Sequence, residues 1–427
     1  MTINLGEVCW KIGSGATPRG GKEAYLTSGQ YALIRSQNVH NDGFHSEGLA
    51  YIDQQQASDL ANVEVCHEDI LLNITGDSVA RACQVDPKVL PARVNQHVAI
   101  IRPDSAQLDP RFLRYYLVTP EMQSKLLSWA GAGGTRNALT KGMIESFDVS
   151  APENLDEQRA IAHILGTLDD KIELNRRMSE TLEAMARALF KSWFVDFDPV
   201  RAKAEGRDPG LPEHIADLFP ARLVDSELGE IPEGWEVKPL SEVIEVNPAR
   251  SLKKGTVAPY LDMASMPTRR HTPDSVVDRP FGSGTRFMNG DTLVARITPC
   301  LENGKTAFVD FLEEDQVGWG STEYLVLRPK PQLPPEFAYC LARSVEFRDF
   351  AIQSMTGSSG RQRVPARSLD HYRLVTCPAP IAKAFGGFVP PLFERASYAV
   401  AESRTLADLR DTLLPKLISG ELRVRIR

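Results

Sequence analysis

The sequence contains few cysteines and no long apolar segment. Its 427 residues include six cysteines, none of which forms a C-x-x-C pair: Cys9, Cys66, Cys83, Cys300, Cys340 and Cys377. This spacing argues against a zinc site and is typical of a reducing compartment, so we expect a cytoplasmic protein. The absence of a run of eighteen apolar residues argues against a membrane helix. Residues 1–10 lack the basic and apolar regions of an export signal.

The sequence also lacks an excess of positive charge. Its 49 Lys and Arg residues against 56 Asp and Glu residues give a net charge of −7, which by itself argues against a nucleic-acid-binding protein. The acidic excess lies mainly in residues 153–230, however, whereas residues 231–378 contain equal numbers of acidic and basic side chains. A neutral domain with basic clusters in its loops can still bind DNA.

The sequence contains no complete catalytic motif. The tripeptide Gly304-Lys305-Thr306 resembles the end of a phosphate-binding loop, but the first glycine of that motif would fall at Pro299. The eight histidines show no pairing at metal-ligand spacing. We therefore expect this chain to contain neither catalytic residues nor a metal site.

An internal repeat is the most informative feature of the sequence. Residues 95–103 (NQHVAIIRP) align with residues 321–329 (STEYLVLRP) at a shift of 226, and the same shift superposes the glycine-rich segments 131–134 and 357–360. Two copies of one unit therefore cover nearly the whole chain, and each copy is a globular region followed by a helix. A repeat of this length indicates a duplicated domain with pseudo-two-fold symmetry rather than a solenoid.

Each globular region alternates short strand-like runs with turns and helices, so the predicted fold class is α+β. Residues 99–103 and 325–329 resemble strands that end at proline, and residues 110–118 and 335–342 resemble helices with proline near their starts. The predicted organisation is a first domain at 1–153, a helix at 154–195, a connector at 196–230, a second domain at 231–380, and a second helix with a C-terminal tail at 381–427.

Two long amphipathic helices are predicted to pack on each other as an antiparallel coiled coil. Asn154 is a suitable N-cap, and Glu157 could complete a capping box. Apolar residues then recur at alternating spacings of four and three, interrupted by Asn175 and Ser179. Pro415 is expected to kink or end the second helix. The predicted seam contains Ile161, Leu165, Leu168, Ile172, Leu182, Leu189, Trp193, Leu392, Leu406, Leu413 and Leu417.

Several segments occur in the order seen in a known family. They are LGEV at residues 5–8, SGATP at 14–18, the stretch from Leu182 to Pro199, GEIPEGW at 229–235, and LLPKLISGEL at 413–422. Together with the duplicated plan of domain and helix, they make the chain similar, over essentially its full length, to the specificity subunits of type I restriction-modification enzymes.

This resemblance implies a non-catalytic reader of double-stranded DNA. Each domain would read one half of a bipartite, asymmetric site, and the paired helices would fix the distance between the half-sites and dock the modification subunits, two in number. Those partners would bind S-adenosylmethionine and flip out an adenine for N6 methylation. Restriction subunits would add ATP- and Mg-dependent translocation and cleavage. No cofactor is expected in this chain.

Residues that read bases are predicted from their chemistry and from their position near loops. Arg, Asn, Gln and Lys donate hydrogen bonds that match the edges of guanine and adenine. In the first domain the candidates are Arg35, Gln37, Asn38, Arg136 and Asn137. In the second they are Arg269, Arg270, Arg296, Asn303, Lys305, Arg361, Gln362 and Arg363. The glycine-rich loops in both domains could approach phosphate closely or simply form turns.

Two other classes of protein remain open at this point. One is a self-contained DNA methyltransferase whose donor site is not recognisable in the sequence. The other is a coiled-coil scaffold that does not bind DNA. Binding of S-adenosylmethionine by the isolated chain would favour the first, and a lack of salt-dependent DNA binding by the assembled complex would favour the second.

Overall fold

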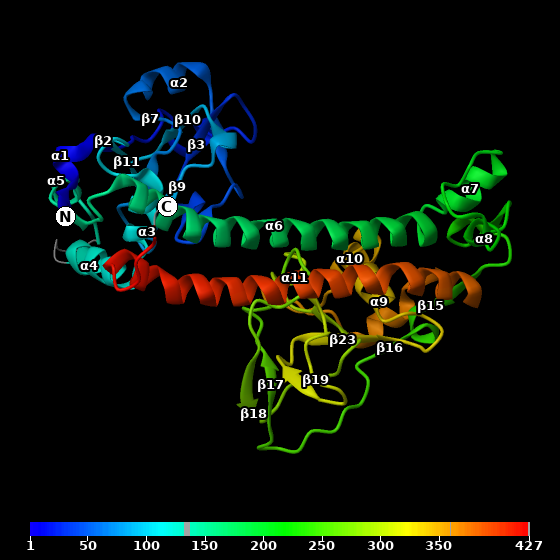
Figure 1. Ribbon diagram of the computed structural model, residues 1–427. Coiled ribbons are helices and arrows are strands. Elements are labelled where there is room, and N and C mark those ends of the chain that lie inside the picture. Colours follow the sequence, from blue (N-terminus) through cyan, green and yellow to red (C-terminus); the bar gives the residue numbers. More distant parts are fainter. Residues whose placement is uncertain (132–136, 359, 426–427) are drawn as a thin grey trace. The chain divides into compact units, whose positions relative to one another are not determined.

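The computed structural model describes residues 1–131, 137–358 and 360–425 (Figure 1). The chain folds into two compact units, each of which is described by itself. Unit 1 comprises Met1–Glu173 and Arg404–Arg427, and unit 2 comprises Leu174–Ser403. Each unit therefore contains one globular domain and part of each long helix. No described helix is long and apolar enough to cross a membrane.

Among the described residues, unit 1 has three sheets that recur in unit 2, besides one short hairpin. The first has the order β2 (Cys9–Ser14), β11 (Val98–Pro103), β8 (Ile70–Asn73) and β9 (Ala82–Gln84), and all its neighbours are antiparallel. The second has the order β6 (Ala50–Ile52), β3 (Tyr31–Ile34), β10 (Ala92–Val94) and β7 (Glu64–Val65), in which β3 and β10 are parallel. The third pairs β1 (Thr2–Asn4) with β12 (Asp148–Ser150).

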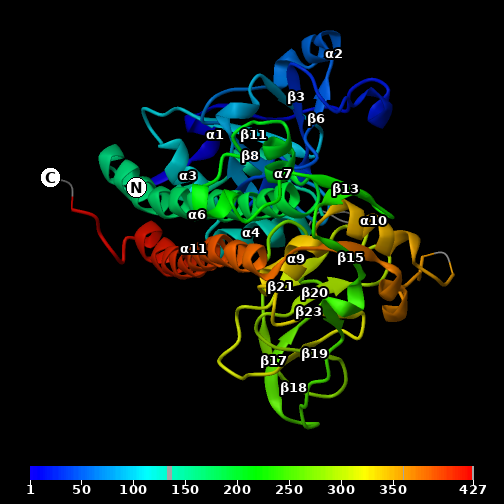
Figure 2. The same cartoon turned by 90° about the vertical axis from the view of Figure 1, so that its right-hand side faces the viewer.

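Unit 2 repeats these sheets in the same order. Its first sheet is β16 (Ile244–Val246), β23 (Tyr324–Pro329), β20 (Thr292–Ala295) and β21 (Thr306–Phe308). Its second is β18 (Val277–Pro280), β17 (Val257–Leu261), β22 (Gly318–Gly320) and β19 (Thr285–Phe287), with β17 and β22 parallel. Figure 2 labels β17, β18 and β19 of this sheet. Its third pairs β15 (Glu236–Pro239) with β24 (Arg373–Thr376). The predicted duplication and the α+β class are therefore confirmed.

The same ion pair holds the first sheet of each unit. In unit 1, Arg102 at the end of β11 donates two hydrogen bonds of 2.7 Å to the fully buried carboxylate of Asp69. In unit 2, Arg328 at the end of β23 lies 3.1 Å from the fully buried Asp291, which also pairs with Arg250 at 3.0 Å. The recurrence of arginine before proline thus reflects a structural requirement of the repeated fold.

The two segments predicted as helices with proline near their starts are both helical. In unit 1, α3 (Pro110–Leu117) begins with proline at its first position and is capped by Asp109, and α4 (Pro120–Gly131) follows it. In unit 2, α9 (Glu336–Ala342) and α10 (Val345–Gln353) take the same places after β23. All residues of α9 are buried, because this helix packs against the first sheet of its own unit.

The two long helices are α6 (Leu155–Phe194) and α11 (Ala379–Ser419). The side chain of Asn154 caps α6 by accepting a hydrogen bond from the backbone N–H of Asp156 at 2.9 Å. The expectation that Pro415 ends the second helix is wrong, because α11 continues to Ser419. The missing N–H of Pro415 costs the helix one hydrogen bond, while Leu414 and Leu417 on either side are buried in the core of unit 1.

The helices pair in antiparallel fashion within each unit, as predicted. In unit 1, Arg410 of α11 donates to Asp169 of α6 at 2.8 Å. In unit 2, Asn175 donates to Glu402 at 2.7 Å, and the hydroxyl of Ser179 donates to the carbonyl oxygen of Ala396 at 3.2 Å. Residues later in the sequence of α6 therefore contact residues earlier in the sequence of α11.

The seam of unit 2 contains one buried polar residue, Glu183, that the heptad pattern did not predict, beside the expected Asn175 and Ser179. In unit 2 its buried α6 positions include Asn175, Ser179 and Glu183, whereas the predicted seam residues Leu182 and Leu189 are only half-buried. Here α6 packs on the globular domain as well as on α11, and this second contact moves its buried face by one residue. Of the other predicted seam residues, Ile161, Leu165, Trp193 and Leu417 are buried, and Leu168, Ile172, Leu392, Leu406 and Leu413 are half-buried.

The segment predicted as a connector is folded against the core of unit 2. It contains α7 (Asp198–Ala204), α8 (Glu213–Ala216) and the hairpin of β13 (Leu223–Ser226) and β14 (Gly229–Pro232). Phe219 packs edge-on against Trp193 with ring centroids 5.0 Å apart. The connector therefore fixes the end of α6 in this unit.

Candidate nucleic-acid interface

In unit 1, two of the predicted base-reading residues line one polar hollow. The hollow has a volume of about 920 Å³ and includes Gln37 and Asn137, both of which are exposed. The other lining residues are also mostly polar: Ser36, Thr75, Gly76, Asp77, Ser78, Arg81, His97 and Ala138. Arg136 lies outside the described residues. A concave surface with many donors and acceptors is suited to the edges of bases.

The segment after β3 is held by its own side chains. Arg35 lies over the ring of Tyr25 at 5.2 Å, and its guanidinium donates to the carbonyl of Gly48. Gln37 donates to the same carbonyl at 3.1 Å. Asn38 is fully buried, and its amide donates to the carbonyls of His45 and Glu47 at 2.9 and 3.2 Å. The structure thus gives Asn38 a structural position rather than an exposed one.

In unit 2, two predicted residues gather around one carboxylate. Glu323 accepts hydrogen bonds from Arg363 Nε at 2.9 Å and from Arg296 Nε at 3.2 Å. Arg361 is exposed, and the carbonyl of Gln362 accepts a hydrogen bond from the backbone N–H of Thr298 at 3.1 Å. These hydrogen bonds therefore connect the segment after β20 to the loop that precedes β24.

A second group of predicted residues in unit 2 is organised by Arg343, which lies at the junction between α9 and α10. Its guanidinium donates to the carbonyls of Thr268, Arg270 and Gly304. These contacts hold two predicted reading loops side by side, one with Arg269 and Arg270 and the other with Asn303 and Lys305. Asn303 is exposed, Arg270 pairs with Asp274, and Lys305 donates to the carbonyl of Met263.

The two units differ in side chains at an equivalent backbone position. The N–H of Ile74 donates to the carbonyl of His97 at 2.9 Å, and the N–H of Arg296 donates to the carbonyl of Glu323 at 3.0 Å. In unit 1 this position carries the imidazole of His97, which is bonded to the hydroxyl of Thr75 at 2.6 Å. In unit 2 it carries the Glu323 cluster. One backbone framework therefore presents two different sets of polar groups.

A buried polar network in unit 2 is not predictable from local sequence patterns. Glu183 of α6 accepts a hydrogen bond from the hydroxyl of Tyr339 at 2.7 Å and lies 3.5 Å from His271 Nδ1. On its other side, His271 Nε2 lies 3.0 Å from the hydroxyl of Ser397 and 3.4 Å from Asp310. Glu183, Asp310 and Ser397 are far from His271 in the sequence, so no local pattern reveals these contacts.

His271 is held as a cation by this network. Burial alone would lower its pKa, but the neighbouring carboxylates of Asp310 and Glu183 raise the pKa of His271 to about 9. The imidazole is only 1% exposed and immediately follows Arg269 and Arg270. Of the three consecutive basic residues 269–271, Arg269 and Arg270 therefore belong to the predicted reading loop, whereas His271 is a buried anchor.

Comparison with known proteins supplies independent evidence. The model of the type I restriction modification DNA specificity domain matches residues 1–184. The HindI specificity subunit of Haemophilus influenzae is 25% identical over 375 residues, which cover 77% of this chain and 81% of that protein. The MjaIX specificity subunit of Methanocaldococcus jannaschii is 26% identical over 324 residues, covering 73% and 68%.

A solved structure has the same fold. The crystal structure of a type I restriction-modification S subunit from M. genitalium aligns with a TM-score of 0.58 at 14% identity, covering 100% of this chain and 96% of that one. The family match, the relatives and the shared fold agree with the duplicated architecture described above. The chain is therefore similar over about three quarters of its length to type I restriction enzyme specificity subunits, and residues 1–184 match their DNA specificity domain.

Proposed function

We propose that this chain recognises DNA sequence as the non-catalytic specificity subunit of a type I restriction-modification complex. The observation that carries the proposal is the repetition of one three-sheet framework with different polar side chains at equivalent positions, His97 in unit 1 and Glu323 in unit 2. Two related but diverged readers suit a bipartite site whose half-sites differ in sequence. Each domain would read one half-site.

The chemistry would belong to partner subunits. Two modification subunits would bind S-adenosylmethionine and methylate adenine at N6, and restriction subunits would supply translocation and cleavage with ATP and Mg. The complex would act on double-stranded DNA in the cytoplasm. The net charge of −7 fits this division, because a chain without a basic excess gains little from counterion release. We expect the isolated subunit to bind DNA weakly and the assembled complex to bind it tightly.

The paired helices would set the distance between the half-sites. Their antiparallel contacts in each unit include a polar pair, Asp169 with Arg410 in unit 1 and Asn175 with Glu402 in unit 2. Buried or partly buried polar contacts favour one register of a helix pair over others. A single register would give a single spacer length.

A domain exchange tests the proposal. The chain is co-expressed with its modification subunits, and methylated adenines are mapped across the host genome. Replacing residues 231–378 by the corresponding domain of a relative should change one half of the bipartite motif and leave the other half and the spacer unchanged. A control exchanges the largely exposed segment 206–210 and should leave the whole motif unchanged. A motif that changes in both halves, or no methylation that depends on this chain, would overturn the proposal.

A further inference from the structure

A short hairpin in unit 1 brings together three side chains, those of His40, Asp42 and His45. The hairpin consists of β4 (Val39–His40) and β5 (Gly43–Phe44), and its turn contains Asp42. His40 lies opposite Gly43, and the N–H of His45 donates to the carbonyl of Asn38. Because side chains alternate between the two faces of a strand, His40 and His45 project from the same face.

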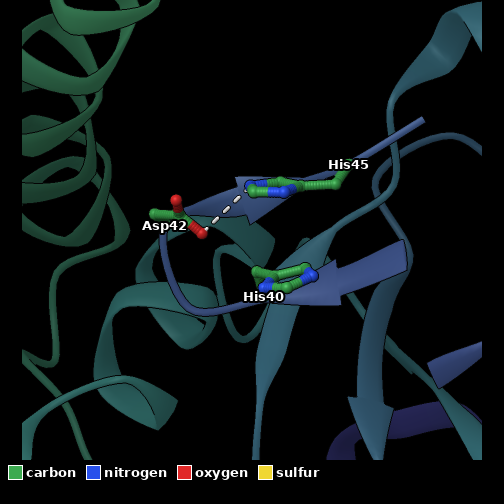
Figure 3. Close-up of side chains that lie close together, drawn as sticks. All are labelled: His40, Asp42 and His45. Carbon is green, nitrogen blue, oxygen red and sulfur yellow. Dashed lines mark ion pairs between the residues drawn. The ribbon is translucent and has the colours of Figure 1, made fainter. Parts of the chain in front are cut away.

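The three side chains lie close enough to share one ion. One ligand atom from each of His40, Asp42 and His45 lies within 4.8 Å of the others. Figure 3 shows the two imidazoles stacked, with the Asp42 carboxylate beside the ring of His45. The ring centroids are 4.1 Å apart, and His45 Nε2 lies 3.2 Å from Asp42 Oδ1. The side chains of His45 and Asp42 are 46% and 64% exposed, so they can turn toward an ion without unpacking a core.

The surroundings of the cluster favour metal binding. His40 Nε2 lies 3.0 Å from the carbonyl oxygen of Gln37. In a neutral imidazole this contact places the proton on Nε2 and leaves the lone pair of Nδ1 available as a ligand. Metal-binding histidines commonly donate their second N–H to a backbone carbonyl in this way, which fixes the tautomer and the orientation of the ring.

The backbone of the turn is also fixed from outside. The side chain of Asn41 donates to Gln123 at 3.0 Å and accepts from the N–H of Ala82 at 2.9 Å. The carbonyl of Asn41 accepts from Arg114 at 3.0 Å, and Arg114 is itself paired with Asp169 at 2.8 Å, which offsets its charge. A turn held at three points presents its ligands with little further ordering.

We propose that His40, Asp42 and His45 form a binding site for a divalent transition-metal ion of the zinc class. Two imidazoles and one carboxylate are a donor set that zinc accepts, with water in the remaining position. Magnesium and calcium prefer oxygen ligands alone, so this donor set disfavours them. Binding replaces the ion pair between Asp42 and His45, and the exposed ring of His45 turns out of the stack so that its lone pair points to the ion beside Nδ1 of His40.

The site adjoins the predicted DNA-reading surface. His40 contacts the carbonyl of Gln37, whose side chain lines the polar hollow of unit 1. A bound dication would therefore fix this segment and add positive charge beside it. This consequence rests on the proposed function, whereas the metal site itself does not.

Cobalt binding tests the site. The full-length chain without a histidine tag is treated with a chelator, dialysed and titrated with Co²⁺, whose visible absorption reports ligation, and then with Zn²⁺ in competition. We expect one ion per chain. The double variant His40→Asn/His45→Asn should bind at least about tenfold more weakly, and the control His163→Asn, which changes an exposed histidine of α6, should bind as the unchanged chain does.

The outcomes separate the two proposals. Equal Co²⁺ binding by the double variant and the unchanged chain, or the absence of binding, would overturn the metal site while leaving the methylation motif as evidence for DNA recognition. The unfolding midpoint of the double variant is measured in parallel without metal and should equal that of the control. If it falls well below the control, the single variant Asp42→Asn, which retains both rings, replaces it and must still weaken binding for the site to stand.

Discussion

The hydroxyl of Tyr339 donates a hydrogen bond of 2.7 Å to Glu183 inside unit 2, and both residues are 2% exposed or less. Tyr339 also accepts from Arg343, which holds the predicted reading loops of this unit. The contact therefore connects α6, through two side chains, to the loops that contain Arg269 and Asn303. A buried carboxylate requires such partners, because an unpaired one is costly.

Substitution Tyr339→Phe should destabilise unit 2. It removes one donor from the buried carboxylate while keeping the ring, so we expect the free energy of unfolding to fall by about 1–3 kcal/mol. Urea denaturation measures the change. The control Tyr398→Phe alters a tyrosine that is 70% exposed on α11 and should leave stability unchanged. If Tyr339→Phe and Tyr398→Phe have the same free energy of unfolding, the buried carboxylate of Glu183 does not need the hydroxyl of Tyr339 for stability.

The stability of unit 2 should depend on pH through His271. Its pKa is raised to about 9 from an ordinary value near 6.5, so the folded state binds the proton more tightly than the unfolded state. The stabilisation is fully present below pH 6.5 and is lost as pH rises from 6.5 through 9. Its size is on the order of 3 kcal/mol. Urea denaturation at pH 6, 7.5 and 9.5 should show this decline, and His271→Gln should flatten it. An equally steep decline in the variant would contradict the assignment to His271.

Arg361 offers the cleanest test of base reading in unit 2. It is exposed, whereas Arg363 also holds Glu323 at 2.9 Å, so a change at Arg363 disturbs the fold as well. We expect Arg361→Ala to weaken binding of cognate DNA by the assembled complex by about 1–3 kcal/mol if it contacts a base, and the double variant with Arg363→Ala to weaken it further. Fluorescence anisotropy at fixed salt measures the affinity. The control Arg367→Ala changes a nearby exposed arginine. Unchanged affinity in both Arg361 variants would remove these residues from the interface.

Asp69 should be essential to unit 1 for reasons unrelated to DNA. Its buried carboxylate receives two hydrogen bonds from Arg102 and one of 2.7 Å from the N–H of Cys66. We expect Asp69→Ala to lower the free energy of unfolding of unit 1 by about 3–5 kcal/mol, because it leaves the partly buried Arg102 without its carboxylate partner. Limited proteolysis should then cleave unit 1 faster and leave unit 2 unaffected. The control Asp59→Ala, at an exposed position, should cleave as the unchanged chain does.

The sequence predicts the framework better than the interface, and particular residues show why. The buried strands β11 and β23 repeat at a shift of 226 and end with Arg-Pro, so local pattern and repetition locate them. Asn38 has the chemistry of a base reader, yet it is fully buried, because residue type does not reveal which loop folds over it. Glu183 and Tyr339 are 156 positions apart, and His40, Asp42 and His45 are linked only by the turn of a hairpin. The first contact depends on tertiary structure, and the second depends on a turn geometry that residue type alone does not specify.

Lengthening both long helices by one heptad tests their role as a spacer. Insertions of seven residues after Glu173 in α6 and after Ser403 in α11 fall where units 1 and 2 divide, and seven residues keep the buried face in phase. Each insertion adds about 10.5 Å of helix, which corresponds to about three base pairs of DNA. Methylation mapping should show unchanged half-sites separated by a longer spacer. Seven residues inserted at Gly206, in the exposed part of the connector, should leave the spacer unchanged. An unaltered spacer in the helix variant would mean that the helices do not set the distance between half-sites.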